Sequence, residues 1–396
     1  MRIKATPDDF VVTEIVDIDM SSSPSPGRAG YRIYVMEKRG WNTLDAISSI
    51  AKASRIDPPL IGYAGLKDRH ARTVQYLSVP AGYELTSKRD DIRLTFLGFS
   101  RDFISTKVLV GNRFEVRVGG LTAGDAARMA QRAREVGRDG FPNYFDDQRF
   151  GSVSGSGDFA AERIVRGHLR GALKIHLAEV FPGQKKAERE RRASIAAVWG
   201  EWDKVFELCE REEDRAVVRP LLGGASKKNL IAALNAIPHE AMARYIAAYQ
   251  AFIWNEVLRR NLRKTGAPLH EVSGKAGPYL FPPGPVVDAG LEIPTVAAKL
   301  APCSPSVRVE IEEVLSERGL ALSDFNVRGL RSGYFKSFTR KAWAIPEGLV
   351  AGAPQPDRQR PSEFEVRLAF TLPAGSYATM FLKALTVPTS SPGSAG

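Results

Sequence analysis

The chain has 396 residues, which is too long for one ordinary hydrophobic core, so two domains are expected. Hydrophobic residues make up 43% and aromatic residues 9%, a composition typical of a globular rather than a disordered protein. Lys and Arg total 56 against 45 Asp and Glu, and this net charge of +11 fits either a polyanionic partner such as nucleic acid or a basic surface that only maintains solubility.

Cysteines and hydropathy indicate the compartment. Cys209 and Cys303 lie far apart and form no metal-ligand cluster, which fits a reducing environment. No apolar run reaches the roughly 18 residues of a membrane span, and the N-terminus lacks the apolar segment of a signal peptide. We therefore expect a soluble, cytoplasmic protein without a membrane partner. The sequence gives no indication of the oligomeric state.

The first part of the chain is dominated by strands. The predicted strands are Phe10–Val16, Tyr31–Met36, Ile61–Leu66, Thr73–Val79, Ile92–Phe99 and Arg113–Val118. A Ser/Pro/Gly-rich loop is expected at Ser21–Gly30, and helices are expected at Thr43–Arg55 and Thr122–Gly137. This part of the chain has many strands and few helices between them, which predicts an α+β domain built on a mixed or antiparallel sheet.

The pattern then becomes mostly helical, from about residue 157 to residue 266. Apolar residues recur at helical spacing over His239–Lys264, which predicts a long helix with a buried face. Near the end, apolar and polar residues alternate over Phe364–Phe370, as in a half-buried strand. A last helix with Met380, Phe381 and Leu385 inward follows, and the Ser/Pro/Gly-rich residues 387–396 are expected to be disordered.

Several familiar cofactor motifs are missing. The Gly-rich segments 151–157 and 223–228 lack the Gly-Lys-Ser/Thr ending that cradles a triphosphate. The five histidines are scattered, and none stands at metal-ligand spacing from a carboxylate. We therefore expect no metal site and no nucleotide cofactor.

One charged turn, within residues 62–75, stands between two predicted strands. Asp68 is the only acid there, and Lys67 and Arg69 flank it directly. Such cations hold a carboxylate ionised and could also grip phosphate. From these residues alone, a salt-bridged turn is the favoured interpretation and a reactive carboxylate is the alternative.

A second segment, residues 141–151, mixes aromatic, amide and guanidinium side chains. Aromatic faces can stack on bases, and Asn or Gln side chains can read a base edge. Aromatic residues are more often core than stacking platforms, so a buried cluster is favoured without further evidence.

Five stretches, in the same order along the chain, resemble the signature segments of the TruD family of pseudouridine synthases. They are Lys4–Glu14, Gly65–Ala71, Gly111–Phe114, Asn143–Gly151 and Leu372–Thr379. The resemblance implies a discontinuous pseudouridine-synthase catalytic domain at 1–154 and 346–386, with a mixed sheet. It also implies an inserted, mostly helical TRUD-type domain at 155–345.

The resemblance implies an isomerase that converts a specific uridine of tRNA, most typically uridine 13, to pseudouridine without a cofactor. The same chemistry at another tRNA position or on another RNA stays open, as does an RNA-binding or chaperone role without catalysis. An RNA methyltransferase would need a Gly-rich donor-binding turn after an early strand, and the sequence has none.

The resemblance also assigns roles to individual residues. Asp68 is the essential carboxylate and Lys4 its partner. Phe145 matches the aromatic that stacks on the flipped uracil, Asn143 a group that holds the active-site loop, and Tyr377 an aromatic near the pocket. The remaining expected substrate contacts are Lys67, Arg69 and Arg149. The chain departs from the family at Asp146, where glycine is usual, and Asp147 adds a second acid there.

Overall fold

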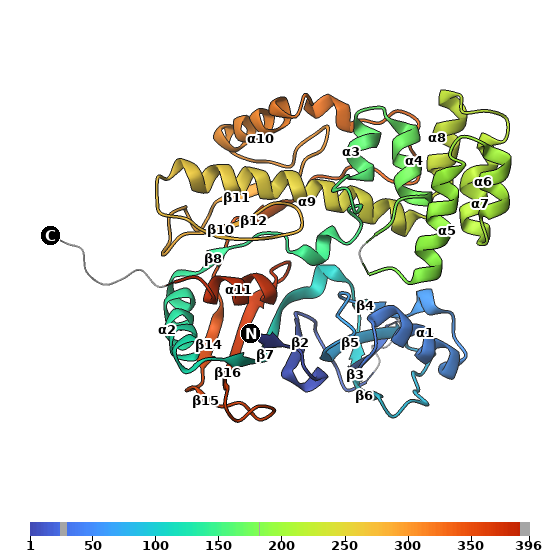
Figure 1. The fold of residues 1–396 in the computed structure, drawn as a ribbon. Coiled ribbons are helices and arrows are strands. Elements are labelled where there is room, and N and C mark those ends of the chain that lie inside the picture. Colours follow the sequence, from blue (N-terminus) through green and yellow to red (C-terminus); the bar gives the residue numbers. More distant parts are fainter. Residues whose placement is uncertain (24–29, 182, 389–396) are drawn as a thin grey trace. The chain divides into compact units, whose positions relative to one another are not determined.

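A computed structural model describes residues 1–23, 30–181 and 183–388 (Figure 1). The predicted tail therefore lies outside the described residues from position 389 on, as does most of the predicted loop at Ser21–Gly30. The chain divides into two compact units: unit 1 comprises Met1–Phe141 and Ala344–Gly396, and unit 2 comprises Pro142–Trp343. The chain passes from unit 1 to unit 2 between residues 141 and 142, whereas the expected domain boundary lies between residues 154 and 155. The segment around Asn143 falls in unit 2 because its hydrogen bonds are made there.

Unit 1 is built on one mixed sheet, as the sequence predicted. Its main strands follow the order β14-β16-β7-β2-β5-β3-β6. Their bounds are β2 (Phe10–Val16), β3 (Tyr31–Arg39), β5 (Arg72–Pro80), β6 (Ile92–Ser100), β7 (Leu109–Leu121), β14 (Glu347–Ala351) and β16 (Phe364–Pro373). Shorter strands add to it: β1 (Arg2–Ile3) on β7, β4 (Gly62–Tyr63) on β5, and β15 (Gln355–Pro356) on β16. β2 and β5 pair in parallel, whereas their other neighbours in the sheet are antiparallel.

The helices of unit 1 pack on one face of this sheet (Figure 1). At one end, α1 (Thr43–Ser54) covers the apolar side chains of β3 and β5. At the other end, α2 (Ala123–Asp139) and α11 (Ala378–Leu385) cover β7, β14 and β16, where Phe381 packs on Phe370 with ring centroids 4.2 Å apart. The strand register connects the two ends of the sheet. Phe370 of β16 pairs with Phe114 of β7, which pairs with Val12 of β2, and Val12 pairs with Thr73 of β5. Paired residues share a face of a sheet, so both sets of helices lie on the same face.

On the opposite face, the sheet buries a small apolar cluster of Ile33, Ala64 and Ile104 at its β3–β5 end and carries charge along β7. Along β7, Arg113, Glu115 and Arg117 alternate with buried Phe114 and Val116. This alternation is the pattern of a sheet with one face packed on a core. The patterned strand and helix predictions of unit 1 are therefore confirmed to within a few residues at most ends.

One strand prediction is wrong in extent: Ile61–Leu66 yields only the two-residue β4. A Cβ at Gly62 would lie 2.3 Å from Ser78 Oγ and 2.6 Å from Ile104 O, so the backbone can approach there only because the residue is glycine. Beyond Tyr63 the backbone leaves β5. Gly65 O instead accepts a hydrogen bond from the Gln75 side chain, Nε2 to O, at 2.9 Å.

Unit 2 is mostly helical. Its longest element, α9 (His239–Lys264), has the predicted bounds, and Tyr249 and Trp254 on it are fully buried. α10 (Pro305–Glu317) lies alongside it (Figure 1). The other helices are α3 (Ala160–Val165), α4 (Leu169–Leu177), α5 (Lys186–Ala197), α6 (Trp202–Leu208), α7 (Glu212–Val218) and α8 (Lys227–Ala236). Short strand pairs complete it: β9 (His270–Val272) with β10 (Tyr279–Phe281), and β11 (Glu292–Pro294) with β12 (Thr339–Lys341).

The remaining elements are short. β8 (Phe141–Pro142) and β13 (Trp343–Ala344) stand where the chain enters and leaves unit 2. The 3-10 turns are η1 (Pro7–Asp9), η2 (Pro58–Leu60), η3 (Thr106–Val108), η4 (Asp147–Phe150), η5 (Arg219–Leu221) and η6 (Leu322–Phe325).

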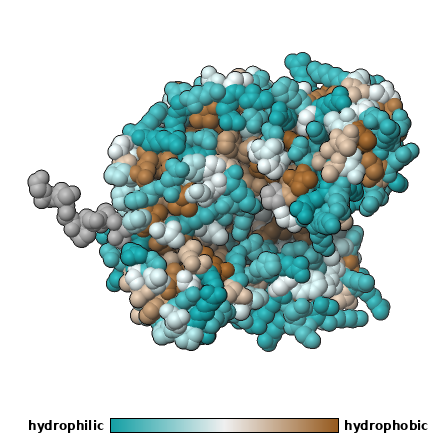
Figure 2. All heavy atoms as spheres, in the orientation of Figure 1, coloured by the Kyte–Doolittle hydropathy of each residue, from teal (hydrophilic) through white to brown (hydrophobic). Residues whose placement is uncertain are grey.

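The visible surface is mostly hydrophilic, with apolar residues in scattered patches (Figure 2). Scattered apolar side chains are normal on a protein surface. Among the described residues, no helix combines the length and the apolar character needed to cross a membrane.

Candidate active site

Asp68 lies on the turn between β4 and β5, and 43% of its side chain is exposed. Lys4 Nζ donates a hydrogen bond to Asp68 Oδ2 at 2.5 Å, and this Nζ also lies 4.3 Å from the centre of the Phe10 ring. The Lys4 backbone has φ of 62°, in the left-handed region that residues other than glycine rarely adopt. Such strain is typical of functional sites, because the surroundings must over-determine the conformation.

Beneath the turn lies a second lysine that the sequence analysis missed. Lys38, on β3, is fully buried, and its Nζ donates to Trp41 O at 2.6 Å and to Asp68 O at 3.3 Å. Burial lowers the pKa of Lys38 to about 8, although the negative charge of Asp68 acts in the opposite direction. Lys38 therefore fixes the backbone of Asp68, whereas Lys4 holds its carboxylate.

The flanking Lys67 is engaged by a buried acid. Its Nζ lies 2.6 Å from Glu14 Oε1, and the Glu14 side chain is fully buried on β2. Glu14 Oε2 also accepts the backbone N–H of Tyr76 at 3.0 Å. The Lys67 ammonium is thus directed into the protein in this structure, and the expectation that it grips phosphate has no geometric support.

Two buried polar side chains close the network. Thr43 Oγ1 accepts the backbone N–H of Lys67 at 2.8 Å and donates to Gln75 Oε1 at 3.0 Å. Gln75 in turn holds Gly65 O, as described above. Buried groups that are fully hydrogen-bonded rigidify their surroundings, so the turn that carries Asp68 is pre-organised.

The other two predicted residues of unit 1 are more open. Arg69 is exposed, and its Nε donates to Gly40 O at 3.0 Å. Tyr377 is half-buried at the N-cap of α11, on the helix-bearing face, where its carbonyl accepts the backbone N–H of Phe381 at 3.2 Å. Unit 1 thus gathers Lys4, Lys67, Asp68 and Arg69 around one turn.

Unit 2 holds the second predicted segment. Phe145 exchanges both backbone hydrogen bonds with the side chain of Asn255, on α9, at 2.9 Å each. The Arg340 guanidinium lies over the Phe145 ring, 4.3 Å from its centre, and Trp254 packs edge-on at 5.3 Å. Phe145 is 5% exposed, so it is both a core residue and a ring with one face occupied by a cation.

Asn143 is a fastening residue in this structure. Its Oδ1 accepts from Arg340 Nη2 at 2.8 Å, and its Nδ2 donates to Lys341 O at 3.0 Å. Arg340 Nη2 also donates to the Asn143 carbonyl at 2.7 Å. The Asn143 side-chain amide therefore bonds to Arg340 and Lys341, which ties the segment around Asn143 to β12.

The two acids that depart from the family pattern are accommodated locally. Asp147 Oδ1 accepts the backbone N–H of Lys275 and the hydroxyl of Tyr279, both at 2.8 Å. Burial and this bond raise the pKa of the Tyr279 hydroxyl. Asp146 is buried, and its carbonyl accepts the backbone N–H of Arg149 at 2.8 Å. Arg149 is exposed, with its guanidinium 5.8 Å from the centre of the Phe145 ring.

The residues missed by the sequence analysis shared a readable signal. Lys38, Glu14 and Gln75 occupy positions on the buried face of their strands, where the alternation calls for apolar side chains. Register pairs Lys38 with Thr73 and Met36 with Gln75, which brings these polar groups to one end of the sheet. A polar residue in an apolar alternation therefore marked the site.

The chemistry available here is that of an accessible carboxylate beside an ammonium. A carboxylate can act as a nucleophile or as a base. Within the described residues, no group of three or more His, Cys, Asp and Glu side chains could hold a metal ion.

Comparison with known proteins identifies the family. The family model described as tRNA pseudouridine synthase D (TruD) matches residues 1–275. The chain is 30% identical to the probable tRNA pseudouridine synthase D 1 of Methanococcus maripaludis, over 97% of this chain and 98% of that protein. It is 32% identical to the probable tRNA pseudouridine synthase D 2 of Methanocaldococcus jannaschii, over 97% and 91% of the two chains.

A solved structure supports the fold. A crystal structure from Methanosarcina mazei, described as TruD, aligns with a TM-score of 0.70 over 97% of this chain and 93% of that one, at 22% identity. Together with the family match over 275 residues, these findings show that the chain belongs to the TruD family of tRNA pseudouridine synthases.

Proposed function

We propose that this protein isomerises a uridine of tRNA to pseudouridine, that Asp68 is its essential carboxylate, and that uridine 13 is the target. The observation that carries the proposal is the Asp68 side chain: 43% exposed, paired with Lys4 and mounted on a pre-organised turn. Family membership supplies the reaction. Because its family acts on tRNA, we place the protein in the cytoplasm.

The reaction is balanced without a co-reactant. The bond between the sugar C1′ and the base N1 breaks, the base turns, and a bond forms between C1′ and C5. The C5 hydrogen leaves as a proton, and N1 gains a proton. Asp68 is suited to attack the sugar, to attack the ring or to remove a proton, because all three steps need an ionised carboxylate. The base must first leave its stack, which costs a few kcal/mol.

The two units contribute different groups in this proposal. Unit 1 carries the chemistry, and unit 2 corresponds to the inserted TRUD-type domain. Phe145 is assigned the stacking on the flipped uracil. Its ring is 5% exposed, and the guanidinium groups of Arg340 and Arg149 lie 4.3 Å and 5.8 Å from its centre, so the base must displace a neighbour to stack there. Asn143 holds that segment in place, and Lys67 orients the Asp68 turn through Glu14.

Exposed cations complete the proposed substrate contacts. Arg69 and Arg149 meet phosphates, because both side chains are exposed and charged. Tyr377 borders the base, since it stands half-buried on the helix-bearing face of the sheet.

The test uses the proton that the reaction must lose. Unmodified tRNA transcripts labelled with tritium at C5 of uridine are incubated with the protein, without cofactor, and released tritium is counted. Carbodiimide mapping then locates the product. We expect release of one tritium per tRNA and modification at uridine 13. Asp68→Asn should lower the rate at least about a thousand-fold while affinity changes only a few-fold.

Asp90→Asn is the matched control, because Asp90 is another exposed aspartate of unit 1. It should turn over like the wild type. Product at another uridine would contradict uridine 13 as the target but would not affect the role of Asp68. Tight, salt-sensitive RNA binding without product on any RNA would favour a binding-only protein, and retained turnover in Asp68→Asn would refute the carboxylate's role.

A further inference from the structure

One stretch, which ends just beyond unit 2, is basic without any acid. Residues 326–346 contain no Asp or Glu, although the whole chain has 45 in 396 residues, or about one in nine. Arg340 in this stretch is buried against the Asn143 segment. The other cations, Arg328, Arg331, Lys336 and Lys341, are exposed, and none of them forms an ion pair with a residue that the structure describes. Their positive charge is therefore not neutralised within the described chain.

Two aromatic side chains stand exposed in the same stretch. Tyr334 is 72% exposed and Phe338 is 51% exposed, and Lys336 between them is also exposed. Burial alternates along these residues, with Phe335 buried and Ser337 half-buried between the exposed side chains. Such alternation is typical of an extended segment, in which residues i, i+2 and i+4 lie on one side of the backbone. The three side chains thus form an aromatic–cation–aromatic row, about 13 Å long at 3.3 Å per residue. We call it the 334–338 row.

The backbone beneath the row is rigidly held. Phe338 pairs with Thr295 through two hydrogen bonds, from Thr295 N to Phe338 O at 2.9 Å and from Phe338 N to Thr295 Oγ1 at 3.1 Å. Lys336 O accepts from the Gln250 side chain at 3.1 Å. Phe335 points inward and packs against Phe325, with ring centroids 5.1 Å apart. The exposed rings are therefore pre-positioned, which lowers the entropy lost on binding.

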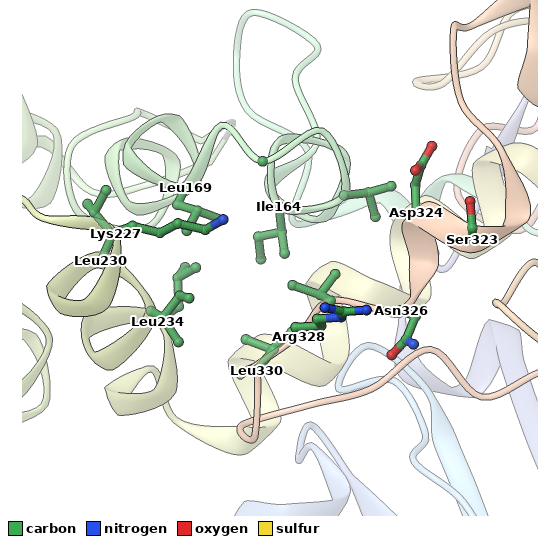
Figure 3. A pocket seen from close by; sticks show the side chains of 14 residues that line it. Ile164, Leu169, Lys227, Leu230, Leu234, Ser323, Asp324, Asn326, Arg328 and Leu330 are labelled. Atoms are coloured by element: carbon green, nitrogen blue, oxygen red, sulfur yellow. The ribbon is translucent and has the colours of Figure 1, made fainter.

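Hollows border the row. A cavity of about 680 Å³ is lined by residues 298–302, 325–327, 330 and 333–337. It shares Asn326, Val327 and Leu330 with a second cavity of about 700 Å³, in which the nitrogen-bearing ends of Lys227 and Arg328 flank a largely apolar lining (Figure 3). Apolar walls with cations beside them suit bases and the phosphates that join them.

We propose that the 334–338 row, with Arg328 and Arg331, is an RNA-contact surface on which two bases stack on Tyr334 and Phe338. Lys336 meets the phosphate between them, and the two arginines meet neighbouring phosphates. The identity of the RNA, a tRNA, rests on the proposed function. Stacking fits every base, and the phosphate contacts carry no sequence information, so the surface binds an unpaired strand without reading its sequence.

The charge pattern favours RNA over a protein partner. Exposed aromatic rings alone are compatible with a protein interface, since Tyr, Phe and Arg are enriched there. Lys is depleted at protein interfaces, whereas each phosphate met by one of the four unneutralised cations of this stretch releases a counterion.

The test measures the affinity for unmodified tRNA transcripts as a function of salt, in the full-length protein. Tyr334→Ala and Phe338→Ala should each weaken binding about ten-fold through lost stacking. Tyr334→Trp should restore the affinity, because stacking is retained. Lys336→Gln should reduce the slope of log affinity against log salt by about one unit. Tyr83→Ala, at a tyrosine of unit 1 that is 44% exposed, is the matched control and should bind like the wild type.

The outcomes separate this surface from the proposed function. If the alanine variants fold, as shown by an unchanged melting temperature, and bind tRNA with the affinity and salt slope of the wild type, the surface does not contact RNA. That result would leave tritium release by the wild type unaffected. If the wild type releases no tritium but the variants lose affinity, the surface stands and the proposed function fails.

Discussion

Two carboxylate clusters lie on the two faces of the unit 1 sheet, and they differ in how they are held. On the helix-bearing face, Asp68 is 43% exposed and pairs with Lys4. On the opposite face, Arg117 bridges Asp9 and Glu365, whose side chains are 7% and 0% exposed. Both clusters bring the N-terminal segment onto the sheet, but only the first leaves a carboxylate open to a substrate.

The bridged cluster is saturated with donors. Asp9 also accepts the backbone N–H of Thr6 at 2.7 Å, and Glu365 accepts that of Arg358 at 3.3 Å. Burial opposes the charge on Arg117, but its hydrogen bonds to Glu365 and Asp9 prevail and raise its pKa. Similar ion pairs thus stand in different surroundings: the buried pairs of Arg117 fasten the fold, whereas the half-exposed Lys4–Asp68 pair keeps a carboxylate accessible, as the proposed function requires.

Removing Arg117, which bridges Asp9 and Glu365, should have the largest effect on stability. Arg117→Met leaves the buried Asp9 carboxylate without its cation and leaves buried Glu365 only the more distant Arg367 and Arg358, at 3.5 Å and 3.9 Å. We therefore expect a loss of about 3–5 kcal/mol in the free energy of unfolding. Turnover per folded molecule should stay near the wild-type value. Urea unfolding measures the first and tritium release the second. Arg113→Met, at an exposed arginine of the same face, should change stability by less than about 0.5 kcal/mol. A similar small change in Arg117→Met would contradict the comparison.

Breaking the Lys4–Asp68 pair should lower the reaction rate strongly and change the stability little. Lys4→Met should slow single-turnover tritium release about a hundred-fold, because the Asp68 carboxylate loses its ammonium partner. The free energy of unfolding should change by less than about 1 kcal/mol, since the pair is partly exposed and screened by solvent. Lys4→Arg should recover part of the rate. A stability loss as large as that of Arg117→Met, with a normal rate, would reverse the two roles.

The lysine beneath the turn offers a smaller, pH-dependent test. Lys38 has a pKa of about 8 in the folded protein and about 10.5 when solvated, so the unfolded chain binds more protons between these values. Stability then rises with pH in that window. Relative to Lys38→Met, the wild type should gain about 2 kcal/mol between about pH 7.5 and 9.5, measured by urea unfolding. A pH-independent difference would show that Lys38 is not desolvated, and a falling one would reverse the sign.

The sequence predicted much of this fold because its periodic signals are local. The alternation at β16 and the helical spacing at α9 depend only on neighbouring residues, and both elements begin at the predicted positions. The extent of β4 was not predictable in this way, because it ends where the Gln75 side chain replaces the next strand bond.

The candidate site was predictable in part. The residues of the Asp68 turn predict a salt-bridged turn, and ion pairs are present, but those that join Asp68 to Lys4 and Lys67 to Glu14 reach other segments of the chain. The reactivity of Asp68 came from family resemblance and stays a prediction. Contacts over long separations were out of reach: nothing near Asn143 indicates that Arg340, 197 residues later, holds it.

The position of β16 within the sheet has a consequence for synthesis of the protein. β16 lies between β14 and β7, yet it is translated only after all of unit 2. One edge of β7 therefore stays unpaired while all of unit 2 is translated. An exposed strand edge can pair with other chains. Unit 2 can fold during translation, but the sheet that carries Asp68 closes only after all of unit 2 has been translated.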